Sequence, residues 1–179
     1  DDYEGFGGLD ISVYWDFGNQ FVLPNMVHSL CVLGSALGAN VAVHSPPEFS
    51  LLKRVSRQAN SAASEAGAQF IESHEFSVDN EASDVVVAAN WCRLDNFGDP
   101  EKNTEYAKKY NELTFAPENI PNGAIFLTPP PVQLDLLATE ELLQLARNVQ
   151  SSWLNRRVAV LAATVAEMVR SPEDILAII

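Results

Sequence analysis

Basic residues are scarce in this sequence, and it has no long apolar run. Its 179 residues include 11 Lys and Arg against 24 Asp and Glu, which gives a formal net charge of −13. Because nucleic-acid backbones are held by Lys and Arg, this balance argues against a nucleic-acid partner. No apolar run approaches the roughly 20 residues that a membrane-spanning helix needs, so we expect no membrane partner either.

Cysteine and histidine are also few. Two cysteines, at positions 31 and 92, fit free thiols in a reducing compartment better than a disulfide framework. We therefore expect a cytoplasmic protein, or one of an organelle matrix if the chain is processed. The three histidines, His28, His44 and His74, fall on different predicted elements, and neither cysteine is spaced to join them. We predict no metal site.

Targeting and cofactor motifs are missing as well. The chain begins Asp-Asp-Tyr without methionine and shows no signal-peptide pattern, so we expect a processed or excised piece of a longer polypeptide. A dinucleotide site would place Gly-x-Gly-x-x-Gly after the first predicted strand, where the sequence reads Trp15-Asp-Phe-Gly-Asn-Gln-Phe21. The sequence predicts no cofactor.

What the sequence does contain is an alternation of strands and helices. The predicted strands are 11–15, 41–44, 69–72, 84–89 and 124–127. The predicted helices are 24–37, a helix capped by Ser45–Glu48 and ending at Ala66 before Gly67, one exposed helix within 96–111, and 139–148, 154–169 and 171–179. This order predicts an α/β fold: a doubly wound, mostly parallel five-stranded sheet with helices on both faces. We expect a single domain over residues 1–179, with a flexible glycine-containing lead-in at 1–8.

Ligands of such folds bind beyond the carboxyl ends of the strands. Asn90 and Trp91 follow the fourth predicted strand, and Trp91 fits either a pocket wall or plain core packing. Thr128 follows the fifth strand and leads into Pro129–Pro131. Proline fixes φ and has no amide donor, so this turn offers carbonyl oxygens to a ligand.

The last long helix carries an unusual cation. Arg156 lies at its predicted start, where the helix dipole disfavours positive charge. Two readings stay open: a solvated arginine tolerated at slight cost, or a guanidinium aimed at a substrate group in the crevice.

In this order, these segments resemble the second, amino-acid-binding domain of the aspartate/ornithine transcarbamylase family. The segment Ala89–Asp99 is most similar to the N-acetylornithine and N-succinylornithine branch, which carries a tryptophan there. Ala124–Pro131 falls on the turn that carries the family's histidine, and Asn155-Arg156 falls on the Asn-Arg that opens the family's last helix. The resemblance covers nearly the whole chain.

The resemblance implies carbamoyl transfer from carbamoyl phosphate to an amine. It assigns substrate binding to six residues: Asn90, Trp91, Pro129, Pro130, Asn155 and Arg156. Thr128 occupies the position of the catalytic histidine, and Ala89 stands where the acylornithine branch carries a lysine. A threonine hydroxyl can donate one hydrogen bond but cannot carry positive charge, so it would stabilise developing negative charge less well.

Two hypotheses follow from the resemblance. The first is the amino-acid-binding half of an N-acylornithine- or ornithine-type carbamoyltransferase of arginine biosynthesis. It would be inactive alone, because the Ser-x-Arg-Thr motif of the family's first, carbamoyl-phosphate-binding domain does not occur in this sequence. The second is a non-catalytic binding or scaffold protein, a pseudoenzyme of the same family. The implied partners are a small amino acid, the first domain and further copies of the chain, since relatives form trimers.

Overall fold

The computed structural model describes residues 5–16, 21–75, 83–110, 120–129, 141, 144 and 149–169. The chain divides into two compact units, residues 1–148 and residues 149–179. The first unit holds the sheet, and the second holds the last long helix. Each is described by itself below.

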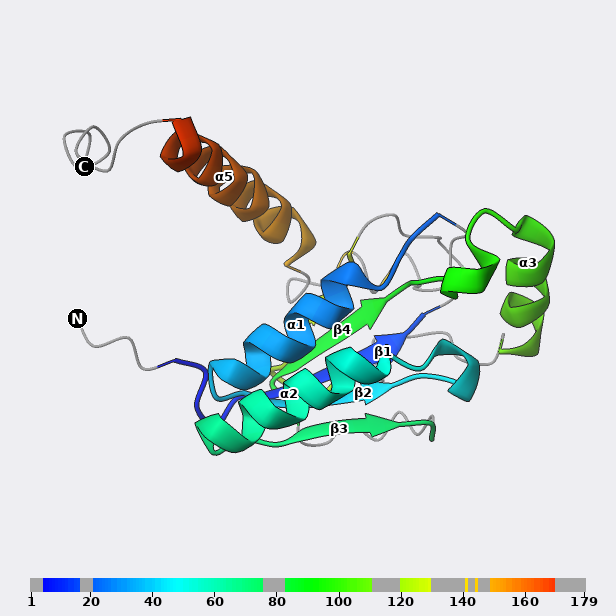
Figure 1. The fold of residues 1–179 in the computed structure, drawn as a ribbon, viewed down its shortest axis with the longest axis horizontal. Helices are drawn as coiled ribbons and strands as arrows, with labels where there is room; N and C mark the ends of the chain where they lie inside the picture. The colour runs from blue at the N-terminus through cyan, green and yellow to red at the C-terminus, as the bar shows by residue number, and fades with distance from the viewer. Residues whose placement is uncertain are drawn as a thin grey trace. The chain divides into compact units, whose positions relative to one another are not determined.

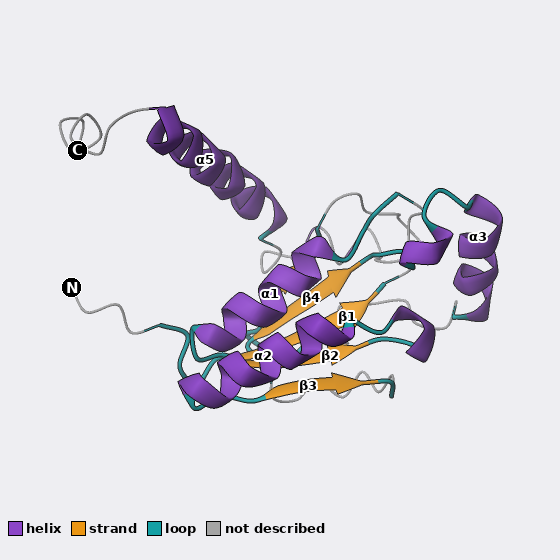
Figure 2. Cartoon of the chain, in the orientation of Figure 1, coloured by secondary structure: helices purple, strands orange, loops and turns teal. Residues whose placement is uncertain are grey.

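Five strands of the first unit form one sheet in the order β3-β2-β1-β4-β5, and every neighbouring pair is parallel. The strands are β1 (Asp10–Trp15), β2 (Asn40–His44), β3 (Phe70–Ser73), β4 (Val85–Ala89) and β5 (Ile125–Leu127). Figure 2 shows β1, β2, β3 and β4 side by side in one layer. The predicted α/β fold with a parallel five-stranded sheet is confirmed.

Helices α1 (Asn25–Ala36) and α2 (Lys53–Ala66) lie side by side over one face of the sheet, as Figure 1 shows. Alternate strand residues point toward them, because successive side chains of a strand point to opposite faces. Val13, Val43 and Val87 occupy neighbouring positions in the register and join the same buried cluster as helix residues Cys31 and Ala59. Each of these five side chains is at most 2% exposed.

The opposite face of the sheet also buries apolar side chains. Val86 and Phe126 are fully buried there, and Tyr14 is 1% exposed and stacks on His44 with ring centroids 4.6 Å apart. Strands that are apolar on both faces are typical of parallel sheets covered on both sides. This burial accords with the predicted architecture.

The start of α2 differs from the prediction, whereas its end does not. Pro47–Phe49 form a separate short 3-10 turn, η1, and α2 begins only at Lys53, so the capping role predicted for Ser45–Glu48 is wrong. Pro46, Ser50 and Leu52 have extended ψ angles of 152°, 146° and 130°, which interrupt a helix. Gly67 ends α2 at φ 72°, as predicted, because glycine adopts the left-handed conformation without steric cost.

The glycine-containing lead-in lies against the end of α1. The amide of Phe6 donates to the carbonyl oxygen of Leu37 at 2.7 Å, and Gly5 has φ +67°. A Cβ added at Gly5 would lie 2.8 Å from that same carbonyl oxygen. The start of the described chain therefore lies close to the backbone at the end of α1, and the flexibility of the lead-in at 1–8 stays a prediction.

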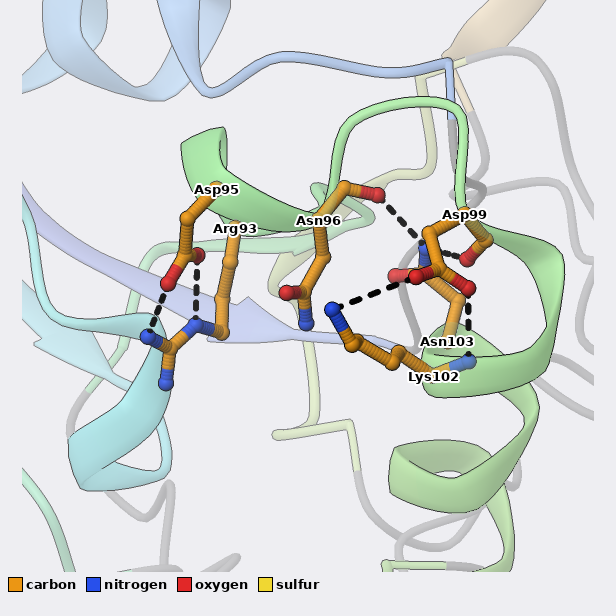
Figure 3. A network of polar contacts seen from close by, with 6 residues as sticks. All are labelled: Arg93, Asp95, Asn96, Asp99, Lys102 and Asn103. Carbon is orange, nitrogen blue, oxygen red and sulfur yellow. Dashed lines mark hydrogen bonds and ion pairs between the residues drawn. The ribbon is translucent and has the colours of Figure 1, made fainter.

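A further helix, α3 (Pro100–Lys109), confirms the exposed helix predicted within 96–111. Its N-cap is Asp99, whose carboxylate accepts from the amide of Lys102 at 3.1 Å. In Figure 3 the side chain of Asn103 turns back onto this cap. Its Nδ2 donates to the carbonyl oxygens of Asn96 and Asp99 at 3.2 and 2.6 Å.

The second unit contains α5 (Gln150–Val169), which begins four residues before the predicted start at Leu154. Only Glu141 and Gln144 of the helix predicted at 139–148 are described, and both are helical. The helix predicted at 171–179 lies outside the described residues. Within the described ranges, every helix is too short or too polar to cross a membrane.

Candidate functional site

The carboxyl ends of the five strands meet along one edge of the sheet, because all strands run in the same direction. The connection order reverses at this edge: the chain adds β2 and β3 on one side of β1, then β4 and β5 on the other. The amide of Asp16 donates to the carbonyl oxygen of Ala89 at 2.9 Å and ties the ends of β1 and β4 together. Open α/β sheets bind ligands at such a switch point.

Four of the predicted site residues lie at this edge. Asn90 and Trp91 follow β4, and Thr128 and Pro129 follow the adjacent strand β5. All four are buried, with Thr128 only 1% exposed. The structure thus places these residues on two neighbouring strand ends, with the Thr128 hydroxyl beneath the surface.

The other three predicted site residues are placed differently. Pro130 lies outside the described residues. Asn155 and Arg156 are exposed on α5, in the second unit, and their joining the strand ends stays a prediction. Because α5 begins at Gln150, Arg156 lies in its second turn, beyond the reach of the N-terminal dipole. The predicted placement of Arg156 at the helix start is therefore wrong, and its role in ligand binding stays a prediction.

Trp91 is held by two hydrogen bonds, one from its indole and one to its backbone carbonyl oxygen. Its indole Nε1 donates to the carbonyl oxygen of Phe49 at 3.1 Å, and its own carbonyl oxygen accepts from Nε1 of Trp15 at 3.0 Å. Phe49 and Trp15 pack together with ring centroids 4.1 Å apart. Trp91 is only 2% exposed and belongs to the core cluster, so it forms part of the rigid support of this edge.

A cavity of about 210 Å³ opens beside Trp91. It is lined by the start of α1, by η1 and the residues after it, and by the segment after β4 that includes the 3-10 turn η2 (Leu94–Asn96). Its lining residues are Pro24, His28, Glu48, Phe49, Ser50, Leu52, Trp91, Cys92, Arg93, Leu94 and Asp95. Pockets that bind drug-sized ligands have volumes of about 300–1,000 Å³, so this cavity is smaller than those. Its size suits one small molecule.

A second hollow, of about 520 Å³, lies at the outer edge of the sheet beside β3. Glu72 faces it, but both carboxylate oxygens of Glu72 are already used. They accept from the amide of Leu51 and from the hydroxyl of Ser56, each at 2.7 Å. The hollow is wide and away from the switch point, so we place the candidate site at the smaller cavity.

Glu48 joins the wall of the cavity to helix α3. Its carboxylate accepts from the ammonium of Lys109, and from the hydroxyl of Tyr110 at 2.7 Å. Partial desolvation raises the pKa of Glu48, but the hydrogen bonds from Lys109 and Tyr110 outweigh it and lower the pKa to about 2. Tyr106 of α3 packs edge-on against Phe49. The wall is therefore held to α3 by both polar and aromatic contacts.

Arg93 supplies a fixed positive charge to the cavity. Its Nε and Nη2 donate to the two carboxylate oxygens of Asp95 at 2.8 and 2.6 Å, as Figure 3 shows. Its Nη1 donates to the hydroxyl of Tyr106 at 3.4 Å. The hydrogen bonds to Asp95 raise the pKa of Arg93 above its ordinary value, so it stays protonated. The side chain is 31% exposed and faces the cavity.

His28 and the two cysteines are neutral. Burial lowers the pKa of His28, and its Nε2 is buried without a hydrogen-bond partner among the described residues. Burial raises the pKa of the Cys92 thiol, and burial together with the charge of Glu72 raises that of Cys31 to about 12. A thiolate nucleophile is not expected at either cysteine.

Asp16 is an unusual titratable residue at the carboxyl ends of the strands. Its side chain is 1% exposed, and no described residue donates to either carboxylate oxygen. Burial raises the pKa of Asp16 well above its ordinary value. Within the described ranges, no three His, Cys, Asp or Glu side chains come together in a way that could hold a metal ion.

The sequence reasoning missed the residues that line this cavity beside Trp91. Arg93 stood within the segment after β4, but nothing in its spacing distinguished it from a surface arginine. Glu48 was assigned to a helix cap, and its partner Lys109 is 61 residues away in the chain. A contact at that separation leaves no local pattern in the sequence.

Comparison with known proteins gives one family. The family model described as aspartate/ornithine carbamoyltransferase, Asp/Orn binding domain, matches residues 8–166. A comparison with curated protein sequences found no match.

Solved structures give the same fold. The chain is 21% identical to N-acetyl-L-ornithine transcarbamylase, with a TM-score of 0.80, over 92% of this chain and 51% of that one. It is 20% identical, with a TM-score of 0.81, to acetylornithine transcarbamylase complexed with acetylcitrulline, over 93% and 51% of the two chains. A mutant of N-acetyl-L-ornithine transcarbamylase complexed with carbamyl phosphate and N-succinyl-L-norvaline gives the same identity and TM-score. The chain spans about half the length of these proteins.

Proposed function

The chain belongs to the aspartate/ornithine carbamoyltransferase family and is its amino-acid-binding domain. From this premise we propose that it is the amino-acid-binding half of an N-acylornithine- or ornithine-type carbamoyltransferase. The cavity at the switch point carries the proposal. It is the size of one small molecule, a tryptophan supports it, and a guanidinium faces into it.

In the proposed reaction, the amine nitrogen of the bound amino acid attacks the carbonyl carbon of carbamoyl phosphate. A C–N bond forms, the C–O bond to phosphate breaks, phosphate leaves and the amine loses a proton. The first domain would hold carbamoyl phosphate through its Ser-x-Arg-Thr motif, which these 179 residues do not contain. The chain alone is then a binding domain without carbamoyl-transfer activity.

Calorimetric titration tests the binding half of the proposal. Ornithine, N-acetylornithine, N-succinylornithine and aspartate are titrated into the 179-residue chain. We expect ornithine or one of its N-acyl derivatives to bind more tightly than aspartate. Absence of binding by every one of these ligands would contradict the proposal, as would formation of a citrulline-type product by the chain alone.

The second candidate function is a non-catalytic binding or scaffold protein of the same fold. Thr128 favours this non-catalytic candidate, since a buried neutral hydroxyl stands at the position of the histidine in the family's turn. A cation at that point would stabilise developing negative charge better than a hydroxyl does. Thr128→His, made in the protein together with its first domain, separates the two. If only this donor is missing, carbamoyl transfer should rise by about 100-fold, on the scale of one oxyanion donor. No gain in a variant that still folds favours the non-catalytic candidate.

We also propose self-association. The resemblance to this family implies further copies of the chain as one partner and the first domain as the other. Sedimentation of the chain with and without that domain tests both, because each association changes the mass in a different way.

A further inference from the structure

We propose that Arg93 binds the carboxylate of the amino acid in the cavity beside Trp91. This inference rests on the proposed function and assigns the residue that recognises the ligand's negative end. Arg93 lies within the segment Ala89–Asp99 that resembles the family, but nothing in the sequence assigned this residue a role. The inference comes from the hydrogen bonds that Arg93 makes and from those that it leaves open.

The guanidinium has five N–H groups, and three of them donate to described residues. Two, on Nε and Nη2, go to Asp95, and one, on Nη1, goes to Tyr106 at 3.4 Å. Among the described residues, one N–H on each terminal nitrogen therefore has no acceptor. In Figure 3 Nη1 points away from Asp95. A carboxylate can accept from both terminal nitrogens in the fork geometry that arginine offers.

The guanidinium is also held in place before any ligand arrives. Asp95 binds one side of it and the hydroxyl of Tyr106 the other, while the chain on either side is fixed. The amide of Cys92 donates to the carbonyl oxygen of Val22 at 2.8 Å, and Nδ2 of Asn103 donates to that of Asn96 at 3.2 Å. Little side-chain entropy is lost when a pre-organised group binds, so its hydrogen bonds add more to affinity.

Among the charged side chains that line the cavity, Arg93 is the one suited to bind an anion. Among the described residues that line it, Arg93 is the one permanent cation, since burial keeps His28 neutral. Lys109 lies close by, but its ammonium is bound to Glu48. The carboxylates of Glu48 and Asp95 would repel a ligand with several negative charges. A ligand with a single carboxylate and an amine therefore fits this cavity better than a phosphate ester does.

Matched ligands and matched variants test the assignment. Affinities are measured by calorimetry for N-acetylornithine and for N-acetylputrescine, which is the same molecule without its carboxylate, and likewise for ornithine and putrescine. The variant is Arg93→Met, which keeps the length of the side chain and removes the charge. Arg57→Met is the control, because Arg57 is exposed on α2, outside the cavity, and its Nε donates only to the carbonyl oxygen of Lys53. Thermal unfolding of each variant checks that it folds.

We expect Arg93→Met to weaken binding of the carboxylate-bearing ligand by about 10- to 100-fold, the range of one or two charged hydrogen bonds. Binding of the decarboxylated partner should be unchanged, and Arg57→Met should change neither. Arg93→Lys should recover part of the loss, because lysine keeps the charge without the fork.

Two results would overturn the assignment, and they differ. An equal effect of Arg93→Met on both members of a ligand pair, or no effect on either, refutes the role of Arg93 and leaves the proposed function standing. Failure of the unmodified chain to bind any of the four ligands refutes both.

Discussion

Replacing Trp91 asks whether this residue supports the site from within the core. The side chain is 2% exposed and its indole Nε1 donates to the carbonyl oxygen of Phe49 at 3.1 Å. Removal of a buried tryptophan side chain costs about 3–5 kcal/mol. Trp91→Ala should therefore lower the free energy of unfolding of the first unit by that amount. Trp91→Phe keeps most of the ring but leaves the Phe49 carbonyl oxygen unpaired, at a cost of about 1–3 kcal/mol.

The assay is urea unfolding followed by far-UV circular dichroism, which does not depend on tryptophan fluorescence. Trp153→Phe is the matched control. Trp153 is half-buried on α5 and lies 5.4 Å from the guanidinium carbon of Arg157, a contact worth about 0.5–1 kcal/mol. Its replacement should cost less than either change at Trp91.

The same variants separate support from ligand contact. Because so little of the Trp91 ring is exposed, Trp91→Phe should change ligand affinity less than it changes stability. An unfolding free energy within about 1 kcal/mol of the unmodified protein for Trp91→Ala would refute the reasoning. So would a loss of ligand affinity, on the scale of about 1–3 kcal/mol for a ring packed on the ligand, with stability unchanged.

Three further variants test the charges and the backbone. The pKa of Glu48 is lowered to about 2, so the stability that its ionised form adds is present above about pH 4.5 and is lost as pH falls toward 2. Glu48→Gln should lower the free energy of unfolding at pH 7 by about 1 kcal/mol or less, since the salt bridge to Lys109 is partly exposed. This loss should vanish near pH 2, and a difference in urea unfolding that does not change with pH would contradict it. The pKa of Asp16 is raised by burial, so the protonated form is favoured and stability falls as pH rises through the folded-state pKa. Asp16→Asn should raise the free energy of unfolding at pH 7 by about 1 kcal/mol or more, and by less below the ordinary pKa of 3.8. A lower free energy of unfolding at pH 7 would contradict this, because it would show that the ionised carboxylate has a partner. Gly67→Ala should lower the melting temperature, because a left-handed φ of 72° costs an alanine about 1–2 kcal/mol. The control Gly7→Ala should leave it nearly unchanged, since φ is not positive there and nothing lies within 4 Å of the added Cβ. Equal melting temperatures for the two variants would contradict the role of Gly67 in ending α2.

Much of the fold could be predicted from local sequence patterns. The apolar run 84–89 predicted β4, and the helical spacing of apolar residues between Pro24 and Gly38 predicted α1. Such patterns work because the periodicities of strands and helices are local properties of the chain. The prediction erred at the start of α2, where an extended segment after the prolines delays the helix to Lys53, and at the start of α5, four residues earlier than expected.

The site was predicted only in part. The strand ends after β4 and β5 follow from the order of elements, so Asn90, Trp91 and Thr128 could be placed at one edge from sequence alone. Their burial could not, because it depends on segments that are distant in the chain. The indole of Trp91, for example, is fixed by the carbonyl oxygen of Phe49, 42 residues earlier.

The sequence by itself determined a mostly parallel α/β sheet and the likeness to one family, because these rest on local periodicity and on the order of motifs. Only the tertiary structure decided which side chains form the cavity. It brought Glu48 to α3, fixed Arg93 between Asp95 and Tyr106, and left Asp16 buried with neither oxygen paired to a described residue. The physical reason is that desolvation and long-range hydrogen bonds arise only when separate segments pack together.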